Sequence, residues 1–372
     1  MKQSMTHPLQ FIGMISHRAS SEIHPPSGPI LDPAYVARFA QAHEQAGFDR
    51  VLVAWHSTSP DALLVASHAA AQTQRIGFMV AHRPGFIAPT LAARQFATFD
   101  HLSGGRAAIH IITGGNPAEQ KQDGDFLDHA QRYQRSDEYV GLLRRVWASE
   151  QPFDHEGTYY RFERAFSEIK PVQKPGIPIF FGGSSDVAIE SAGRHADTYA
   201  FWGETLDQAR DTIARVRASA ARAGRDPDSV RFSLSVRPVL ADTEERAWAR
   251  ARDILDRIRE LRGENFGKGS PKPESIGSKR LLEAASGGAV RDKRLWTEVA
   301  AAVGAGANTT ALVGTPEQVA ESLADYAALG VSTFLIRGFD PLEDALDYGR
   351  TLLPATRRAV AALDRVKEPE HA

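Results

Sequence analysis

A cluster of glycine and serine residues follows one apolar run of the sequence. The stretch Ile177–Gly193 reads IPIFFGGSSDVAIESAG, with Gly182, Gly183, Ser184 and Ser185 near its centre. Glycines let a backbone approach a ligand closely, and the first turn of a following helix offers free N–H groups at its positive end. These residues are therefore a candidate phosphate cradle. An ordinary tight turn with a serine or aspartate helix cap would have the same sequence.

The histidines do not have the spacing of a metal site. None of those near predicted strand ends forms a His-x-x-x-His or His-Glu-x-x-His pair with another. The chain has 0 Cys, which excludes disulfides, thiolate metal sites and a cysteine nucleophile. We therefore expect no metal. The histidines in question are His17, His24, His56, His82, His110 and His129.

Eight short, continuously apolar runs must position these groups, and their composition is typical of strands covered by helices. The amphipathic stretches between them often open with Asp-Pro or Thr-Pro and close on glycine, as helices do. The alternation predicts an α/β fold, a (β/α)8 barrel, with a doubly wound open sheet as the alternative. In both, ligands bind at the carboxyl ends of the strands. The runs are Phe11–Ile15, Arg50–Ala54, Ile76–Ala81, Ala107–Thr113, Ile177–Gly183, Thr198–Gly203, Phe232–Leu240 and Thr333–Gly338.

A long insertion separates the last two runs. The segment Arg262–Trp296 concentrates glycine, proline, lysine and arginine, and we expect a mobile insertion or lid within a single domain spanning residues 1–372. Its cations would close over an anionic ligand; a solvated surface loop is the alternative. They are Lys268, Lys272, Lys279, Arg280, Arg291, Lys293 and Arg294.

Charge and composition favour small-molecule partners. A net charge of -2 and a pI of about 6.7 give no basic field to attract nucleic acid or anionic lipid. The start MKQSMTHPLQ lacks the apolar run of a signal peptide, and no segment approaches the ~18 apolar residues of a membrane span. These features predict a cytoplasmic protein.

Several longer motifs occur in a definite order from about Phe11 to Pro354. In that order the chain resembles the bacterial luciferase-like flavin monooxygenases, and within them the reduced-FMN-dependent alkanesulfonate monooxygenases. The motifs are LVAWHSTSPDALLVAS, VAHRPGFIAPTLAARQFATFDHLSGGRAAIHIITGGNP, DGDFLDHAQRY, FFGGSSDVAIESAG, YAFWGE, SIGSKR and TALVGTPEQVAESLADYAALGVSTFLIRGF.

The resemblance implies a (β/α)8 barrel in which a late insertion acts as a lid. It implies an enzyme that takes reduced FMN (FMNH2) from a separate NAD(P)H-dependent flavin reductase, consumes O2 and cleaves a carbon–sulfur bond to give sulfite and an aldehyde. It also implies a homodimer or homotetramer. A flavin carries the oxygen chemistry, so the protein has to position it and exclude water.

The same resemblance assigns flavin contacts. His129 and Tyr133 of HAQRY are expected near the ribityl phosphate, and the cradle residues on the phosphate itself. Ala81 and His82 of VAHRP match a position where the family often has a non-prolyl cis peptide beside the flavin ring. The remaining flavin contacts that the resemblance implies are Thr113, Gly114, Gly183, Ser184 and Ser185.

Two arginines are candidates for holding an anionic substrate. Arg237 and Arg337 are expected where the seventh and eighth strands end, and the planar fork of arginine matches the three acceptor oxygens of a sulfonate. Trp202 would supply an apolar wall and an indole N–H. The structural alternatives are a salt bridge from Arg237 to a neighbouring carboxylate and a Trp202 that only fills the rim.

Departures from the family pattern fall on the substrate side. Ser59 stands where the alkanesulfonate enzymes typically have cysteine, Ser235 and Arg237 where they have an arginine and a histidine, and Phe339 where they have tyrosine. Many side chains of the first three strand-end loops are polar, which would be unfavourable around an alkyl chain. We therefore expect a polar organosulfonate, such as the sugar sulfonate sulfoquinovose. These polar side chains are Ser16, His17, Arg18, His24, His56, Ser57, Thr58, Ser59, His82 and Arg83.

Proton transfer is expected of His17 or His56, because the ordinary pKa of histidine lies near neutrality.

The sequence leaves other functions open. Related flavin-dependent activities are oxidation of a simple alkanesulfonate or a sulfone, and hydride transfer with deazaflavin F420. A non-catalytic flavin-binding barrel is the alternative from a different class.

Overall fold

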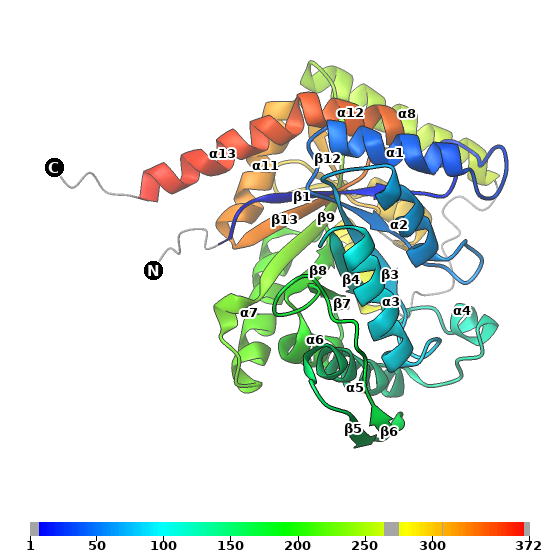
Figure 1. The fold of residues 1–372 in the computed structure, drawn as a ribbon. Coiled ribbons are helices and arrows are strands. Elements are labelled where there is room, and N and C mark those ends of the chain that lie inside the picture. Colours follow the sequence, from blue (N-terminus) through cyan, green and yellow to red (C-terminus); the bar gives the residue numbers. More distant parts are fainter. Residues whose placement is uncertain (1–6, 264–274, 307, 368–372) are drawn as a thin grey trace. The chain divides into compact units, whose positions relative to one another are not determined.

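The computed structural model describes residues 7–263, 275–306 and 308–367. The chain forms two compact units, one made of residues 50–199 and 216–230, the other of 1–49, 200–215 and 231–372. We call them the central unit and the terminal unit, and describe each by itself. Figure 1 labels most of their helices and strands.

The central unit contains parallel strands in the order β2-β3-β4-β7-β8, and its helices follow those strands. Strand β3 is buried along its whole length, which matches the continuously apolar run in its sequence. Its elements are β2 (Arg50–Val53), α2 (Ala62–Ala71), β3 (Gly77–His82), α3 (Pro89–Leu102), β4 (Ala107–Ile111), α4 (Pro117–Gln122), α5 (His129–Ala148), β5 (Phe153–Glu156), β6 (Arg161–Ala165), β7 (Ile179–Gly182), α6 (Asp186–His195) and the 3-10 turn Pro227–Ser229; β8 (Thr198–Trp202) and α7 (Leu206–Arg222) have residues in both units.

The terminal unit contains parallel strands in the order β12-β9-β13-β1, with β10 and β11 added antiparallel beside β12. Helix α8 packs on β9 and β12 through a core that includes Val239, Ile254 and Trp296. Its elements are β1 (Gln10–Ile15), α1 (Pro33–Gln45), β9 (Arg231–Leu240), α8 (Glu244–Arg262), α9 (Ile276–Ser286), β10 (Val290–Arg291), β11 (Leu295–Trp296), α10 (Glu298–Val303), β12 (Ala311–Gly314), α11 (Pro316–Ala328), β13 (Val331–Ile336), α12 (Pro341–Arg350) and α13 (Leu352–Lys367).

The predicted (β/α)8 barrel is confirmed: β1, β2, β3, β4, β7, β8, β9 and β13 are its eight strands, one for each apolar run. The helix starts also follow the sequence. Asp32 and Thr315 accept a hydrogen bond from the first turn of α1 and α11, and each precedes a proline. The antiparallel pairs β5–β6 and β10–β11, and strand β12, were not predicted.

The described part of the insertion contains regular secondary structure. Residues 264–274, with Lys268 and Lys272, lie outside the described residues. From Ser275 onward the chain forms α9, β10 and β11. Helix α9 buries Leu281 against Ala300 and Ala305, so this part of the insertion has a core of its own.

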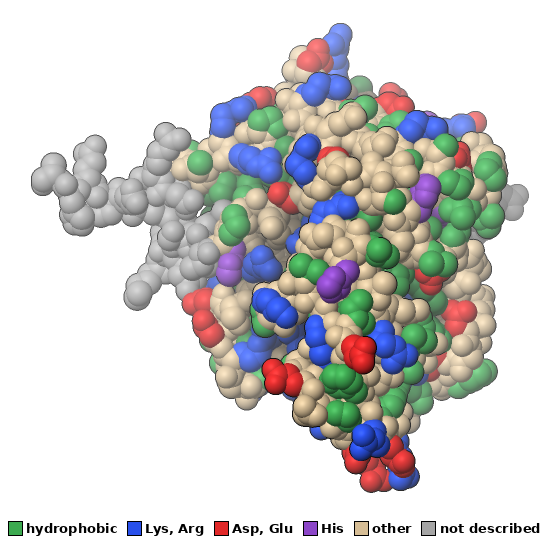
Figure 2. Space-filling model, in the orientation of Figure 1, with side chains coloured by type: hydrophobic (Ala, Val, Ile, Leu, Met, Phe, Trp, Pro, Cys, Tyr) green, Lys and Arg blue, Asp and Glu red, His purple; other side chains and the backbone are tan. Residues whose placement is uncertain are grey.

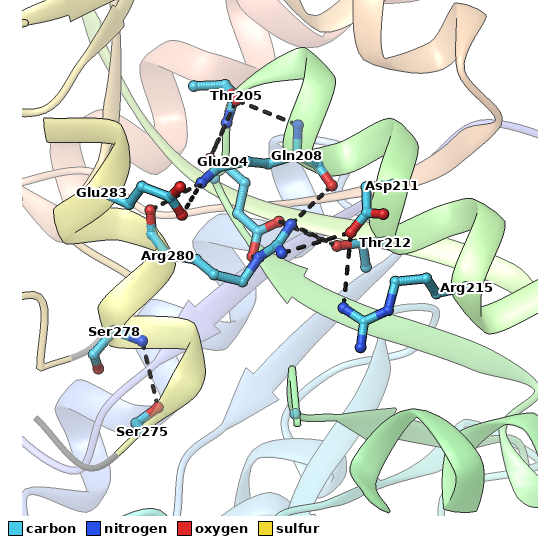
Figure 3. Close-up of polar contacts among 12 residues, drawn as sticks. Glu204, Thr205, Gln208, Asp211, Thr212, Arg215, Ser275, Ser278, Arg280 and Glu283 are labelled. Carbon is cyan, nitrogen blue, oxygen red and sulfur yellow. Dashed lines mark hydrogen bonds and ion pairs between the residues drawn. The ribbon is translucent and has the colours of Figure 1, made fainter. Parts of the chain in front are cut away.

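Three described cations of the insertion bind carboxylates of the terminal unit, and a fourth, Arg291, donates to the Ala284 carbonyl. Arg280 forms two hydrogen bonds with Glu204, 2.7 Å from Nε and 2.8 Å from Nη2 (Figure 3), and the Glu204 side chain is only 1% exposed. Lys293 pairs with Asp325 at 2.7 Å and Arg294 with Glu244 at 3.0 Å. These three cations therefore anchor the insertion by ion pairs, and their closure over a ligand stays a prediction.

Charged side chains are mixed on the face shown in Figure 2, where lysine and arginine lie among aspartate and glutamate. This agrees with the net charge of -2. Among the described residues, no helix is both long and apolar enough to cross a membrane.

Candidate functional site

The predicted phosphate cradle lies between β7 and α6 of the central unit. Gly183 has a φ of +127°, and a β-carbon there would collide with the Tyr133 hydroxyl and with Ala188. Tyr199 donates a 2.5 Å hydrogen bond to the Gly183 carbonyl. Ser185 caps α6 and accepts from the Ala188 amide at 3.4 Å. The turn thus requires glycine, and it brings a tyrosine hydroxyl to the start of a helix.

Tyr133 reaches this turn from α5. Burial raises the pKa of Tyr133 to about 12, although hydrogen bonds to Ser185 and Thr113 oppose the shift. The phenol therefore stays protonated at neutral pH and can donate to an anion. His129, at the first position of α5, is exposed, with its ring 4.9 Å from that of Tyr133. Half-buried Ser184 precedes the capping serine.

The residues predicted at the flavin edge follow β4. The Thr113 hydroxyl lies 3.1 Å from that of Ser136. Gly114 has a φ of +95°, and a β-carbon there would collide with the Gln120 amide. Gln120 is fully buried, and neither its Nε2 nor its Oε1 has a hydrogen-bond partner among the described residues. The turn after β4 is therefore closely packed against Gln120, whose amide atoms are available to hydrogen-bond a ligand.

The expected cis peptide at Ala81–His82 is wrong. Within the described residues the cis peptide is at Lys174–Pro175, and β3 continues through His82, which pairs with Ile111 of β4. A regular ladder keeps the backbone extended, so nothing here offsets the ~3 kcal/mol cost of a non-prolyl cis bond.

The imidazole of His82 faces the helix layer. It makes a 2.7 Å hydrogen bond with the Tyr139 hydroxyl and lies edge-on to Phe96 of α3. Burial lowers its pKa to about 4, so the ring is neutral. His82 is also among the residues that line a cavity at the end of β3, so its place beside the flavin ring stays a prediction.

A cavity of about 160 Å³ opens at the ends of β2 and β3, and Ala81 lines it. Arg83 lies in its wall, with its guanidinium 4.1 Å from the Trp55 ring and Nη2 3.2 Å from Glu119. Arg83 Nε and Nη1 are buried without a partner among the described residues. The cavity therefore offers donors beside apolar walls.

His56 and Ser59 lie on the loop after β2. The His56 side chain is 65% exposed, and its Nδ1 is 3.7 Å from Glu119 Oε1. Ser59 closes a turn by donating its N–H to the His56 carbonyl at 3.0 Å. The loop after β2 thus places an exposed imidazole beside a carboxylate.

In the terminal unit, Arg237 and Arg337 meet around Glu22, which lies on the loop between β1 and α1. Arg237 is 0% exposed; its Nη2 is 2.9 Å from Glu22 Oε2, outside hydrogen-bond geometry, and donates to the Gly338 carbonyl at 2.8 Å. Arg337 Nη2 donates to Glu22 Oε1. The Phe339 ring covers the other side of the Arg237 guanidinium, 3.5 Å from its Cζ. The structural alternative, a salt bridge from Arg237, is confirmed.

The charges of this cluster do not cancel. Burial alone would raise the pKa of Glu22, but the two guanidiniums hold it at about 2, so the carboxylate is ionised. Burial and then the charge of Arg337 lower the pKa of Arg237 to about 10, which leaves it protonated at pH 7. Two cations thus share one anion. Arg237 Nη1 is buried with no hydrogen-bond partner among the described residues.

Trp202 and His17 belong to the terminal unit too. Half-buried Trp202 ends β8 and packs on the cluster of Leu281, Ala300 and Ala305, as expected for a side chain that fills a rim. His17 is half-buried, and its carbonyl accepts from the Asp32 amide at 2.8 Å.

Glu22 is the residue that sequence reasoning missed. The available signal was indirect: a buried pair of arginines requires a carboxylate, and the loop after the first strand carries an acid among its polar residues.

The family of the chain follows from comparison with known proteins. The sequence profile described as luciferase-like monooxygenase matches residues 9–333. This chain belongs to the luciferase-like monooxygenase family. It is therefore an enzyme of that family, and the expected resemblance is confirmed.

Solved structures share the luciferase-like fold. EDTA monooxygenase (EmoA) from Chelativorans sp. BNC1 is 20% identical, with a TM-score of 0.75 and coverage of 95% of each chain. Riboflavin lyase (RcaE), solved with modified FMN and riboflavin, is 20% identical, with a TM-score of 0.74 over 95% of this chain and 92% of that one. DmoA from Hyphomicrobium sulfonivorans is 22% identical, with a TM-score of 0.72 over 94% and 88%.

Proposed function

We propose that this luciferase-like monooxygenase uses reduced FMN and O2 to release sulfite from a polar organosulfonate. The observation that carries the proposal is the cluster of Arg237, Arg337 and Glu22, in which a buried guanidinium nitrogen has no hydrogen-bond partner within the described parts of the chain. A permanent monoanion with three acceptor oxygens would neutralise the cluster and occupy that donor.

The residues of the central unit fit a mononucleotide. Gly183 leaves room where any β-carbon would collide, protonated Tyr133 can donate to a phosphate, and the α6 N-terminus is nearby. We propose that Gly183, Ser184, Ser185, Tyr133 and His129 hold the FMN phosphate. Thr113, Gly114 and Ala81 would line the ring, with Ala81 facing the cavity. That riboflavin lyase is solved with modified FMN supports the choice of cofactor.

Reduced FMN, when bound, supplies the electrons that activate O2. Overall, sulfonate, O2 and FMNH2 become aldehyde, bisulfite, water and FMN: one oxygen atom enters the aldehyde, the other enters water, and the carbon–sulfur bond breaks. We propose that Arg237 and Arg337 orient the sulfonate, with Trp202 as an apolar neighbour. His17 or His56 would move protons, and the exposed His56 pairs with Glu119.

The polar substrate is inferred from the loops. In the central unit the loop after β2 carries His56 and Ser59, and in the terminal unit the loop after β1 carries His17 and Glu22, so each unit by itself offers polar groups to a ligand. A hydroxylated sulfonate such as sulfoquinovose can satisfy them, whereas an alkyl chain cannot. We also propose an NAD(P)H-dependent flavin reductase as partner, a homodimer or homotetramer, and a cytoplasmic site of action.

Sulfite release tests the proposal. The enzyme, FMN, a flavin reductase and NADH are incubated with sulfoquinovose, 2-hydroxyethanesulfonate, octanesulfonate and dimethyl sulfone. We expect sulfite from the hydroxylated sulfonates. Equal or faster turnover of octanesulfonate would refute the polar substrate.

Anaerobic titration with FMNH2 and with F420 distinguishes an FMNH2-dependent monooxygenase from an F420-dependent enzyme. Saturable binding of FMNH2 supports the proposal. Preference for F420 identifies a hydride-transfer enzyme, and tight binding of oxidised FMN without oxygen-dependent turnover of any compound identifies a non-catalytic flavin barrel.

A further inference from the structure

Glu22 is held between two arginines from distant parts of the chain. One carboxylate oxygen pairs with Arg337 and the other lies 2.9 Å from Arg237 Nη2. Arg237 is further fixed by the carbonyls of Arg337 and Gly338, at 3.4 and 2.8 Å, and by the Phe339 ring. Arg237 is thus held beside Glu22 by several contacts besides the ion pair, and Arg337 by the ion pair itself, so the carboxylate is part of the cluster.

The nearby carboxylates are used elsewhere. Asp340 pairs with His24 at 2.5 Å and with Arg250 at 2.8 Å, and Asp344 pairs with Arg250 at 2.6 Å. Among the described residues, these carboxylates form no hydrogen bond or ion pair with the guanidinium of Arg237 or Arg337. The cluster of Glu22 and the two arginines therefore keeps one positive charge of its own.

A residual charge of this kind discriminates between anions. A sulfonate carries one negative charge, whereas a phosphonate or phosphate monoester carries about 1.5 to 2 at pH 7 and above. A monoanion brings the cluster to neutrality. A dianion leaves an excess negative charge beside the Glu22 carboxylate in a partly buried site, where like charges repel strongly.

We propose that Glu22 is a specificity-determining residue that makes the Arg237–Arg337 pair select monoanionic head groups over dianionic ones. The inference rests on the proposed function, because it assumes that these arginines bind the substrate anion. Glu22 acts by its charge, as a built-in counterion that uses up half of the positive charge of the pair.

The test compares two anions of equal size, 2-hydroxyethanesulfonate and 2-hydroxyethylphosphonate, at pH 8. Their dissociation constants are measured by calorimetry for the wild type, Glu22→Gln and Glu22→Asp. The control variant Asp242→Asn removes one negative charge from an exposed i,i+4 pair with Arg246 on α8. Circular dichroism and thermal unfolding verify the fold of each variant.

We expect the wild type to bind the sulfonate at least tenfold more tightly than the phosphonate. In Glu22→Gln this preference falls at least tenfold, because the cluster gains a second net positive charge. Glu22→Asp and Asp242→Asn keep the wild-type preference. If Glu22→Gln is poorly folded, Glu22→Asp is compared with the control Asp242→Asn instead. Loss of the preference for sulfonate over phosphonate in Glu22→Asp, with normal binding of both anions, overturns the charge argument.

The outcomes separate this inference from the proposed function. An unchanged preference in folded Glu22→Gln overturns the inference while sulfite release leaves the function standing. A changed preference without sulfite from any sulfonate supports the anion site and refutes the reaction. Binding of neither anion by the wild type overturns both.

Discussion

Removing the Arg280 guanidinium should destabilise the insertion strongly. In Arg280→Met, the Glu204 carboxylate loses two charge-assisted hydrogen bonds while its side chain stays 1% exposed. Breaking a buried ion pair from one side typically costs 3–5 kcal/mol. Glu204 keeps a 3.2 Å bond from the Thr212 hydroxyl, so we expect the lower end, about 3 kcal/mol.

The matched control is Arg294→Met. This arginine comes from the same insertion and its side chain is 17% exposed against 15% for Arg280, but its partner Glu244 is 44% exposed. Water can take over the contacts of Glu244, so the control should lose little stability. The comparison therefore isolates the burial of the carboxylate partner, because the two arginines themselves are equally covered.

Urea unfolding, followed by circular dichroism, measures both variants, and hydrogen exchange over residues 275–286 shows whether α9 opens locally. We expect a clearly lower midpoint and faster exchange of α9 for Arg280→Met (Figure 3). Equal losses in the two variants would refute the argument that Glu204 burial sets the energy.

Three further predictions concern the two sites. Tyr133→Phe removes a donor from the cradle without emptying it, so the affinity for FMN measured by anaerobic titration should fall about tenfold at most; an unchanged affinity would remove Tyr133 from the phosphate site. Gly183→Val fills the space beside Tyr133, so binding of FMN should fall far more than binding of riboflavin, which lacks the phosphate; equal losses would mean that the turn holds another part of the cofactor. Glu22 has a folded pKa of about 2 against an ordinary 4.5, which corresponds to about 3 kcal/mol of stability that is present above pH 4.5 and lost as the pH falls towards 2. The stability difference between wild type and Glu22→Gln, measured by urea unfolding across this range, should shrink as the pH falls, and a constant difference would contradict the ion pairing.

The eight barrel strands could be predicted because each is a separate apolar run between helical patterns. Strand β12 has the same character, as ALVG, but it directly precedes the Thr315 cap of α11 and is only four residues long. Helix α9 could not be recognised in a region rich in glycine and lysine, because its stability comes from Leu281 and the buried Arg280–Glu204 pair, which are tertiary contacts.

The candidate site also combines features that the sequence predicts with features that it does not predict. The turn at Gly183 could be predicted from composition, since a tight strand-to-helix turn needs glycine. The trans conformation of the Ala81–His82 peptide could not be predicted, because it depends on the hydrogen-bonded ladder between β3 and β4. The contact of Glu22 with Arg337 could not be predicted from the sequence, because the two residues are 315 positions apart and sequence periodicity carries no information on contacts at that separation.

The pairing of β1 with β13 has a consequence for biosynthesis. Gln10, Phe11 and Ile12 lie opposite Thr333, Phe334 and Leu335, so one edge of the first strand stays open until more than 320 further residues have been synthesised. At typical elongation rates of 5–20 residues per second, that edge waits roughly 15 to 65 s for its neighbour. Glu22 meets Arg337 at the same late moment, so the nascent chain forms this cluster of charges only after β13 has been made.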